Sequence, residues 1–252
     1  MIAPLSGLAA LAVHKLRSCW APLHGDNAML DKAQSRPDLL LLLSLVLVIL
    51  IYPLLDHGDF RKLILGAVMF VPLLLATVRL AERKGWVWPT VLLMAVTLIF
   101  GVASTVFPIP ILVGTKWALL VVFFGLTVCG LFPYLKNARS VTDQHLYTAV
   151  SIYLLLGMQW FALYSAIDVF FPGAILQNHA TVTDRSSELL YFSLVTLSTI
   201  GYGDIVPVYG EVRMLAAMEG VTGVLYVAIT VALLVSAYKQ QGNSQEPEAP
   251  TP

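Results

Sequence analysis

Long apolar runs separated by short polar segments dominate this sequence. A transmembrane helix needs about 20 mostly apolar residues to cross the ~30 Å hydrocarbon core of a bilayer. Six runs come close to this length or exceed it, which predicts an all-α membrane protein with six transmembrane helices. The six runs are Leu39–Leu55, Leu63–Leu80, Trp88–Val106, Ile111–Leu135, Leu146–Phe171 and Met214–Tyr238.

A further apolar run, Glu188–Ser198, is too short to cross the bilayer. At 1.5 Å per residue, a helix of about 11 residues is roughly 16 Å long. We therefore expect this run to be a re-entrant pore helix between the fifth and sixth spans. Non-helical backbone is tolerated at membrane depth only where protein buries it or where it lines water. The segment after this helix must therefore lie inside an assembly.

The composition supports a membrane protein and argues against other classes. Hydrophobic residues make up 58% of the chain and charged residues 12%, whereas soluble domains carry about 25% charged residues. The formal net charge is zero, which argues against nucleic acid as a partner because phosphate binding needs a concentrated Lys/Arg surface. The cysteines and histidines form no pattern typical of a metal or catalytic site, so we expect neither enzyme activity nor a cofactor.

The distribution of basic residues predicts the orientation in the membrane. With the N-terminus inside, ten of the 15 Lys and Arg residues fall in inner segments and five in outer segments. An excess of Lys and Arg is typical of cytoplasmic segments. We therefore expect a multi-pass protein of the cell membrane, inner or plasma, surrounded by lipid and with both termini in the cytoplasm.

The runs and the segments between them suggest four parts. Residues 1–37 are expected to be a cytoplasmic segment with an interfacial helix. Residues 38–135 would form a four-helix scaffold, and residues 143–238 a pore domain made of the fifth span, the pore helix, a filter and the sixth span. Residues 239–252 are rich in Gln, Glu and Pro, which predicts a disordered tail.

The segment Thr199–Asp204, Thr-Ile-Gly-Tyr-Gly-Asp, directly follows the short helix. It resembles the signature sequence of potassium channel filters. Moving an ion from water into a low-dielectric interior costs on the order of 20 kcal/mol, so other ligands must replace the water. Backbone carbonyls that point the same way can do so if some residues take φ > 0, which Gly201 and Gly203 adopt without a Cβ penalty.

The resemblance implies a filter that extends from Thr199 to Gly203 and binds K⁺ as the permeant ion. The carbonyl oxygens of Thr199, Ile200, Gly201 and Tyr202 would be the K⁺ ligands, with the Thr199 hydroxyl as the innermost one. The Tyr202 side chain would brace the filter rather than bind the ion. Because the pore needs a ring of such segments and each chain supplies one, the resemblance implies a homotetramer.

The resemblance extends to the arrangement of the spans. Six spans with a re-entrant loop before the last are similar to the six-helix bacterial potassium channels of the ion-channel pore family. The part that carries motifs runs from about Asp143 to Tyr238. It places Tyr191 and Phe192 on the pore helix, and Asp204 after the filter, as residues that support the filter.

The fourth span lacks the charges of a voltage sensor. A sensor needs Arg or Lys at every third position, but Lys116 is the one basic residue between Ile111 and Leu135. We expect Lys116 to extend to the lipid headgroups and the channel not to be strongly voltage-gated. The residues after Tyr238 are too few for a ligand-binding domain of at least about 50 residues, so the gating stimulus stays open.

A gate is expected in the sixth span. Gly223 is the candidate hinge, and Val227, Val231 and Val235 follow it at helical spacing on one face. These valines would close the inner mouth of the pore by dewetting. The alternative is that they are ordinary positions facing lipid or protein.

Glu219 is an acidic residue embedded in the sixth span, one helical turn before Gly223. An acid inside the membrane is costly unless it is paired, and it is a candidate for function. Desolvation without a nearby cation favours the neutral form, which can donate a hydrogen bond. Two roles stay open for Glu219. It would support the filter and affect gating, or it would only hold the fifth and sixth spans together. The expected partners are Thr196, Ser198, Gln159 and Tyr153.

The sequence therefore favours a tetrameric, potassium-selective channel that conducts K⁺ passively. Two alternatives stay open. One is a weakly selective monovalent cation channel, and the other is a non-conducting structural subunit of a membrane assembly.

Overall fold

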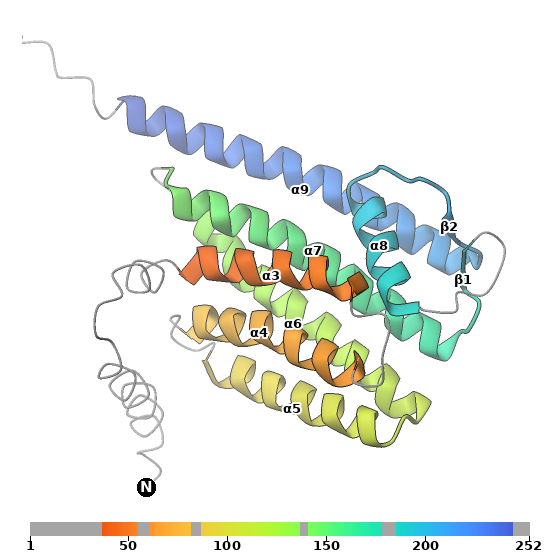
Figure 1. Ribbon diagram of the computed structural model, residues 1–252. Coiled ribbons are helices and arrows are strands. Elements are labelled where there is room, and N and C mark those ends of the chain that lie inside the picture. Colours follow the sequence, from red (N-terminus) through yellow and green to blue (C-terminus); the bar gives the residue numbers. More distant parts are fainter. Residues whose placement is uncertain (1–36, 55–60, 82–86, 137–140, 178–184, 244–252) are drawn as a thin grey trace, which may run out of the picture. The chain divides into compact units, whose positions relative to one another are not determined.

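The computed structural model describes residues 37–54, 61–81, 87–136, 141–177 and 185–243. They belong to one compact unit, Pro37–Pro252, and form seven helices and two short strands (Figure 1). The expected interfacial helix lies outside the described residues. In chain order the elements are α3 (Pro37–Leu54), α4 (Arg61–Ala81), α5 (Val87–Val106), α6 (Pro110–Lys136), α7 (Asp143–Phe170), β1 (Ile175–Gln177), α8 (Arg185–Leu197), β2 (Ile205–Pro207) and α9 (Gly210–Asn243).

Every apolar run identified in the sequence corresponds to a described helix. Four helices, α5, α6, α7 and α9, contain apolar stretches long enough to cross a membrane. In α3 and α4 the described apolar stretches are shorter, Pro37–Tyr52 and Met69–Arg79. The protein is therefore mainly helical with four candidate membrane-spanning helices among its described residues, and the count of six stays a prediction.

Two short strands accompany the helices. Strands β1 and β2 pair antiparallel, with Ile175 opposite Pro207 and Gln177 opposite Ile205, and the fold is otherwise helical, as expected. Helix α9 continues beyond Tyr238 to Asn243, because Lys and Gln are good helix formers. Residues 244–252 lie outside the described residues, and a disordered tail stays a prediction.

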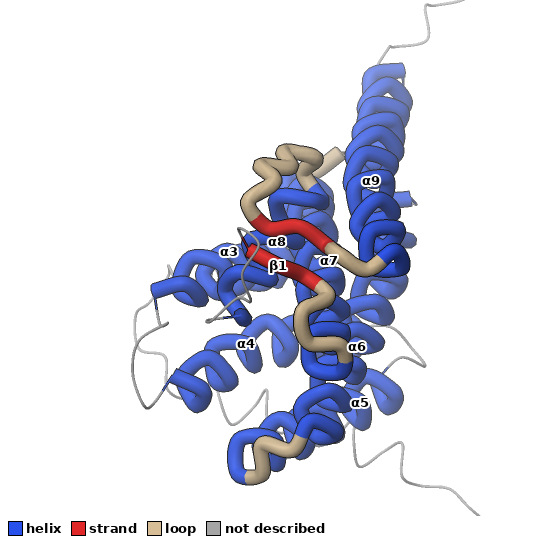
Figure 2. Tube along the Cα trace, turned by 90° about the vertical axis from the view of Figure 1, so that its right-hand side faces the viewer, coloured by secondary structure: helices blue, strands red, loops and turns tan. Residues whose placement is uncertain are grey.

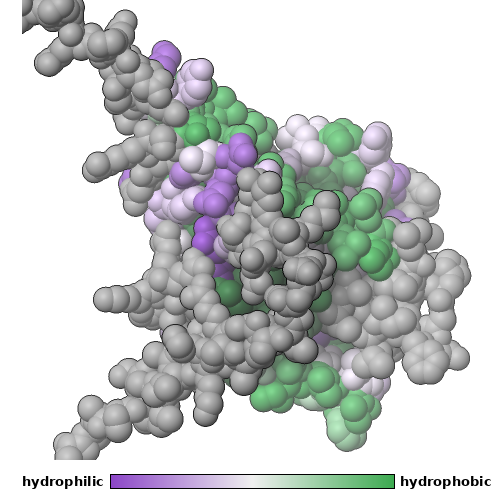
Figure 3. All heavy atoms as spheres, turned by 60° about the vertical axis from the view of Figure 1, so that its left-hand side comes forward, coloured by the Kyte–Doolittle hydropathy of each residue, from purple (hydrophilic) through white to green (hydrophobic). Residues whose placement is uncertain are grey.

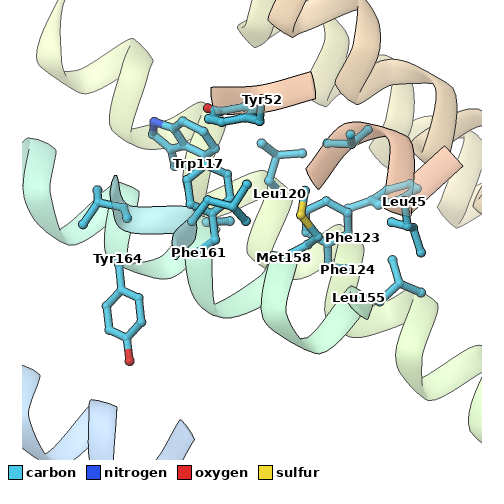
Figure 4. Close-up of a cluster of buried hydrophobic side chains, with 14 of the residues drawn as sticks. Leu45, Tyr52, Trp117, Leu120, Phe123, Phe124, Leu155, Met158, Phe161 and Tyr164 are labelled. Carbon is cyan, nitrogen blue, oxygen red and sulfur yellow. The ribbon is translucent and has the colours of Figure 1, made fainter. Parts of the chain in front are cut away.

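A single apolar core joins the expected scaffold to the pore domain. Helix α7 packs most extensively on α6 and also against α3. Figure 4 shows the buried cluster between these helices. The rings of Tyr52 in α3 and Trp117 in α6 both meet Phe161 of α7 edge-on, with centroids 5.5 and 5.1 Å apart. Aromatic pairs of this geometry contribute about 0.5–1.5 kcal/mol beyond the burial of their area.

A polar cluster joins four helices at the end of the bundle where α3 begins. This end lies opposite the segment Thr199–Asp204, which we call the filter segment after its expected role (Figure 1). Arg79 of α4 donates two hydrogen bonds of 2.7 Å to the carboxylate of Asp38 in α3. The Arg79 guanidinium lies 5.4 Å from the ring centroid of Tyr134 in α6. The same ring stacks on His145 of α7 at 4.5 Å. The scaffold thus contacts the first turn of the pore domain.

Large hydrophobic side chains cover much of the described outer surface. On α5, Leu92 is 65% exposed and Ile99 62%; on α9, Met214 is 66% exposed. Figure 3 shows such hydrophobic areas on one face. Water-soluble monomers rarely expose contiguous patches of this kind, so lipid or further protein is expected to cover these helices.

Candidate functional site

Helix α8 places the filter segment. It has 13 residues, or about 20 Å at 1.5 Å per residue, which is still too short to cross a bilayer. It packs against α7 on one side and α9 on the other. Leu189 and Leu190 are buried, and so is Phe192, whose ring meets that of Tyr164 in α7 at 5.0 Å. Phe192 thus packs between α8 and α7, and its expected role in supporting the filter stays a prediction.

The filter segment begins in a tight turn at the C-terminal end of α8. The Thr199 amide donates to the Thr196 carbonyl at 2.9 Å, and the Ile200 amide donates to the Val195 carbonyl at 3.0 Å. Because these amides bond back to the helix, the start of the segment is fixed by α8. The partial negative charge at a helix C-terminus also favours a cation nearby.

The backbone of the segment alternates in conformation. Thr199, Gly201 and Gly203 have positive φ values of 58°, 57° and 80°. Alternation of this kind can turn successive carbonyl groups toward one side, which a row of ion ligands requires. The two glycines adopt this conformation without penalty. Thr199 is the feature that the sequence analysis missed, because a β-branched residue rarely has positive φ.

The side chains between these positions are largely exposed. Ile200 is 55% exposed and Tyr202 is 69% exposed. The Tyr202 ring lies parallel to that of Tyr191, with centroids 6.4 Å apart. Tyr191 thus connects α8 to the segment through its ring contact with Tyr202.

The two strands hold the end of the segment at Asp204. Strand β2 follows Asp204 directly and pairs with β1, which follows α7 (Figure 2). The Val208 amide extends the pairing with a 2.8 Å hydrogen bond to the Ala174 carbonyl. The segment is therefore fixed at one end by α8 and at the other by backbone pairing with the chain beyond α7.

Glu219 lies behind the filter segment, fully buried where α7, α8 and α9 meet. The Tyr164 hydroxyl of α7 donates to Glu219 Oε2 at 2.7 Å. Ser193 Oγ of α8 lies 2.6 Å from Glu219 Oε1 and 2.9 Å from the Gly157 carbonyl oxygen. Figure 4 shows Tyr164 directed away from the apolar cluster toward α9.

These contacts correct the expected partners of Glu219. They are hydroxyls of the fifth span and the pore helix, as expected in kind, but they are not Thr196, Ser198, Gln159 or Tyr153. A serine hydroxyl has one proton to donate, so Ser193 cannot donate to both of its neighbours. A proton on Glu219 would satisfy all three contacts, which favours the neutral acid.

Helix α9 approaches the end of α8 closely at Gly223. A Cβ atom there would overlap the carbonyl oxygen of Leu197, the last residue of α8. Helix α9 is continuous through this position. Gly223 therefore has a packing role that the sequence analysis did not foresee, and its role as a hinge stays a prediction.

The three candidate gate valines lie on the exposed side of α9. Val227 is 50% exposed, Val231 54% and Val235 49%. Their side chains are directed away from α7 and α8 of the same chain, as a pore lining requires. The same exposure also fits a contact with lipid or another chain.

A pocket of about 480 Å³ separates the filter segment from the first half of α9. Thr199 and Gly201 line it on one side, and Ala216, Ala217 and Gly220 line it on the other. Small residues at such a place allow another helix to approach closely.

Comparisons with known proteins support a channel. Residues 148–240 match the family model described as "Ion channel". A 53-residue segment is 38% identical to a protein of Rhodopseudomonas palustris whose name provisionally describes it as a potassium channel protein. A 75-residue segment is 39% identical to two pore potassium channel b of rice, Oryza sativa subsp. japonica.

Each match covers only part of this chain and a smaller part of the relative. The segments are 21% and 30% of this chain, and 13% and 19% of the two relatives. No solved structure matches the chain. The matched family is one of channels and not a class of enzymes. The region from α7 to α9 therefore resembles an ion channel domain, and with the apolar helices the matches support a transmembrane potassium channel.

Proposed function

We propose that four copies of this chain form a potassium-selective channel that conducts K⁺ down its electrochemical gradient. The observation that carries the proposal is the alternating backbone of Thr199, Gly201 and Gly203 at the end of a half-length helix. Carbonyl oxygens of Thr199, Ile200, Gly201 and Tyr202 would replace the water around each ion. The C-terminal end of α8 would add a favourable potential below the filter.

A ring of four chains explains the exposed surfaces around the filter. Ile200 and Tyr202 are exposed in one chain, although filter backbone at membrane depth must be buried in protein. Neighbouring chains would cover these side chains and fill the pocket beside Gly220. Tyr202 would then brace the ring from behind, with Tyr191 and Asp204 holding it in place.

The remaining helices suggest how the channel sits in the membrane and how it closes. We place both termini on the cytoplasmic side of a cell membrane, because the inner segments carry more Lys and Arg.

Opening would bend α9 at Gly223 and move Val227, Val231 and Val235 away from the pore axis. Strong voltage gating is not expected, since Lys116 is the one basic residue of α6 before Lys136.

Ion flux into liposomes tests this proposal. Purified protein is reconstituted, and K⁺ and Na⁺ gradients are imposed separately. We expect K⁺ flux that greatly exceeds Na⁺ flux and that is abolished in Gly201→Ala, since alanine is strained at a φ of 57°. Comparable K⁺ and Na⁺ fluxes would favour a weakly selective cation channel. An intact tetramer that conducts neither ion would favour a structural subunit.

A further inference from the structure

The structure assigns to Tyr226 the role of a latch that holds the inner half of α9 against α7. Its hydroxyl donates a 2.6 Å hydrogen bond to the backbone carbonyl of Ala149, a residue 77 positions earlier in the chain. We infer that this bond favours the closed pore. The inference rests on the proposed gate in α9, which begins at the next residue, Val227.

The bond joins two helices without disturbing either. A carbonyl oxygen has two lone pairs, so Ala149 can accept from Tyr226 and keep its place in the helical pattern of α7. The Tyr226 ring also lies near that of Tyr153 in α7, with centroids 6.0 Å apart. Tyr226 is therefore held against α7 by a directed hydrogen bond and by ring packing on the same helix.

Tyr226 differs from the other residues of α9 that contact α7 or α8 in its position along the helix, because it lies beyond Gly223. Glu219, before Gly223, is bonded to Tyr164 and Ser193, and Gly223 itself packs tightly on the end of α8. Beyond Gly223, Tyr226 is the one described side chain of α9 with a hydrogen bond to another helix. If α9 bends at Gly223, the contacts before it can persist, whereas a shift of Tyr226 relative to Ala149 by about 1 Å lengthens the 2.6 Å bond beyond hydrogen-bond distance.

The unbroken course of α9 indicates which state the bond favours. Helix α9 is one continuous helix from Gly210 to Asn243 and shows no sharp kink along its length (Figure 1). The bond from Tyr226 exists in this unbent state, which we assign as closed. The net effect of one hydrogen bond corresponds to a change of about five-fold in a two-state equilibrium.

Tyr226 can act on the gate without lining the pore. Successive residues of a helix lie about 100° apart around its axis. Tyr226 faces α7, whereas Val227 is half exposed on another side of α9. Removing the Tyr226 hydroxyl therefore changes the contact with α7 and leaves the valines in place.

Single-channel recording of full-length protein in lipid bilayers tests the latch. Tyr226→Phe removes the hydroxyl alone, and we expect the closed-to-open equilibrium to shift toward open by about five-fold per subunit. Tyr153→Phe is the matched control, since no hydrogen bond of its hydroxyl is found among the described residues, and we expect it to behave like the parent. Tyr226→Leu should shift the equilibrium in the same direction by more.

The same recordings separate the latch from the gate. In a background without Cys19 and Cys129, Val231→Cys is exposed to a thiol reagent from the inner side. Modification that accelerates with open probability supports the gate on which the latch acts. Modification at one rate in all states, or absence of conduction, overturns the gate and the latch together. With the gate upheld, a Tyr226→Phe channel that loses tetramer stability but keeps the parent's open probability overturns the latch alone.

Discussion

Tyr164 and Glu219 are 55 residues apart in sequence, yet the Tyr164 hydroxyl lies 2.7 Å from a carboxyl oxygen of Glu219. Together with Ser193 of α8, they form one polar cluster where α7, α8 and α9 meet. No salt bridge reaches Glu219 among the residues that the structure describes. An acid in this position is stable when it stays neutral or fully hydrogen-bonded.

Replacing Glu219 distinguishes its two possible roles. Glu219→Gln keeps an acceptor and a donor in the same place, so we expect stable tetramers and filter behaviour like the parent at pH 6 and pH 8. Glu219→Leu leaves the Tyr164 hydroxyl without its partner, at about 1–3 kcal/mol, whereas Ser193 can still donate to the Gly157 carbonyl. We expect this variant to lose tetramer stability in detergent and to inactivate faster.

Tyr164→Phe is the matched control, because it removes one hydroxyl and keeps the ring that packs on Phe192. It should lie between the parent and Glu219→Leu. If Glu219→Gln and Glu219→Leu both lose stability while their inactivation equals that of the parent at each pH, Glu219 holds the helices together and has no part in gating.

The sequence predicts Glu219 as a buried acid with hydroxyl or amide partners, because it is the one carboxylate in an otherwise apolar run. It cannot identify the partners, since they depend on how α7 and α9 are rotated against each other. Tyr153 and Tyr164 are three helical turns apart on α7, and either could meet an acid on α9. The three-residue strands and the positive φ of Thr199 carry no periodic signal at all, because both result from how the chain is held at its ends.

The pair of Asp38 and Arg79 yields a prediction about the scaffold. Asp38 is 1% exposed and the Arg79 side chain 16% exposed, so removing one partner leaves the other charge buried. We expect Arg79→Met to lower the free energy of unfolding by about 3–5 kcal/mol. The double variant Asp38→Asn with Arg79→Met should recover much of this loss. A single variant as stable as the parent in thermal unfolding would contradict the prediction.

Weak voltage dependence follows from the basic residues of α6. Lys116 lies with its amine 4.2 Å from the ring centroid of Trp117. Even if this charge crossed the whole field in four subunits, the work would be about 9 kcal/mol per 100 mV, four times ~2.3. We expect fewer than about four apparent gating charges in conductance–voltage curves, and Lys116→Gln should leave the curve nearly unchanged. Steep activation would show that other charges move through the field.

Selectivity should depend on the size and polarity of residue 202. Tyr202→Asp replaces a ring that lies parallel to Tyr191 with a small, hydrated carboxylate, so the filter loses support from behind. We expect the reversal potential in opposed K⁺ and Na⁺ gradients to move toward zero. Tyr209→Asp makes the same chemical change beyond β2, outside the filter, and should keep the parent value. Equal reversal potentials for the two variants would show that Tyr202 is not part of the filter wall.

Two glycines of α9 separate packing from flexibility. A Cβ at Gly223 would overlap the Leu197 carbonyl, whereas a Cβ at Gly220 would lie 3.6 Å from the Thr196 carbonyl oxygen, an ordinary contact. Both changes to alanine reduce helix flexibility similarly, because alanine favours the helix over glycine by about 1 kcal/mol. We expect Gly220→Ala to form conducting tetramers. Gly223→Ala should push α9 from the end of α8, which lowers tetramer yield and K⁺ selectivity together. If Gly223→Ala assembles and selects K⁺ like the parent but opens more rarely, its main role is that of a hinge, and the close approach to Leu197 can relax without disturbing the filter.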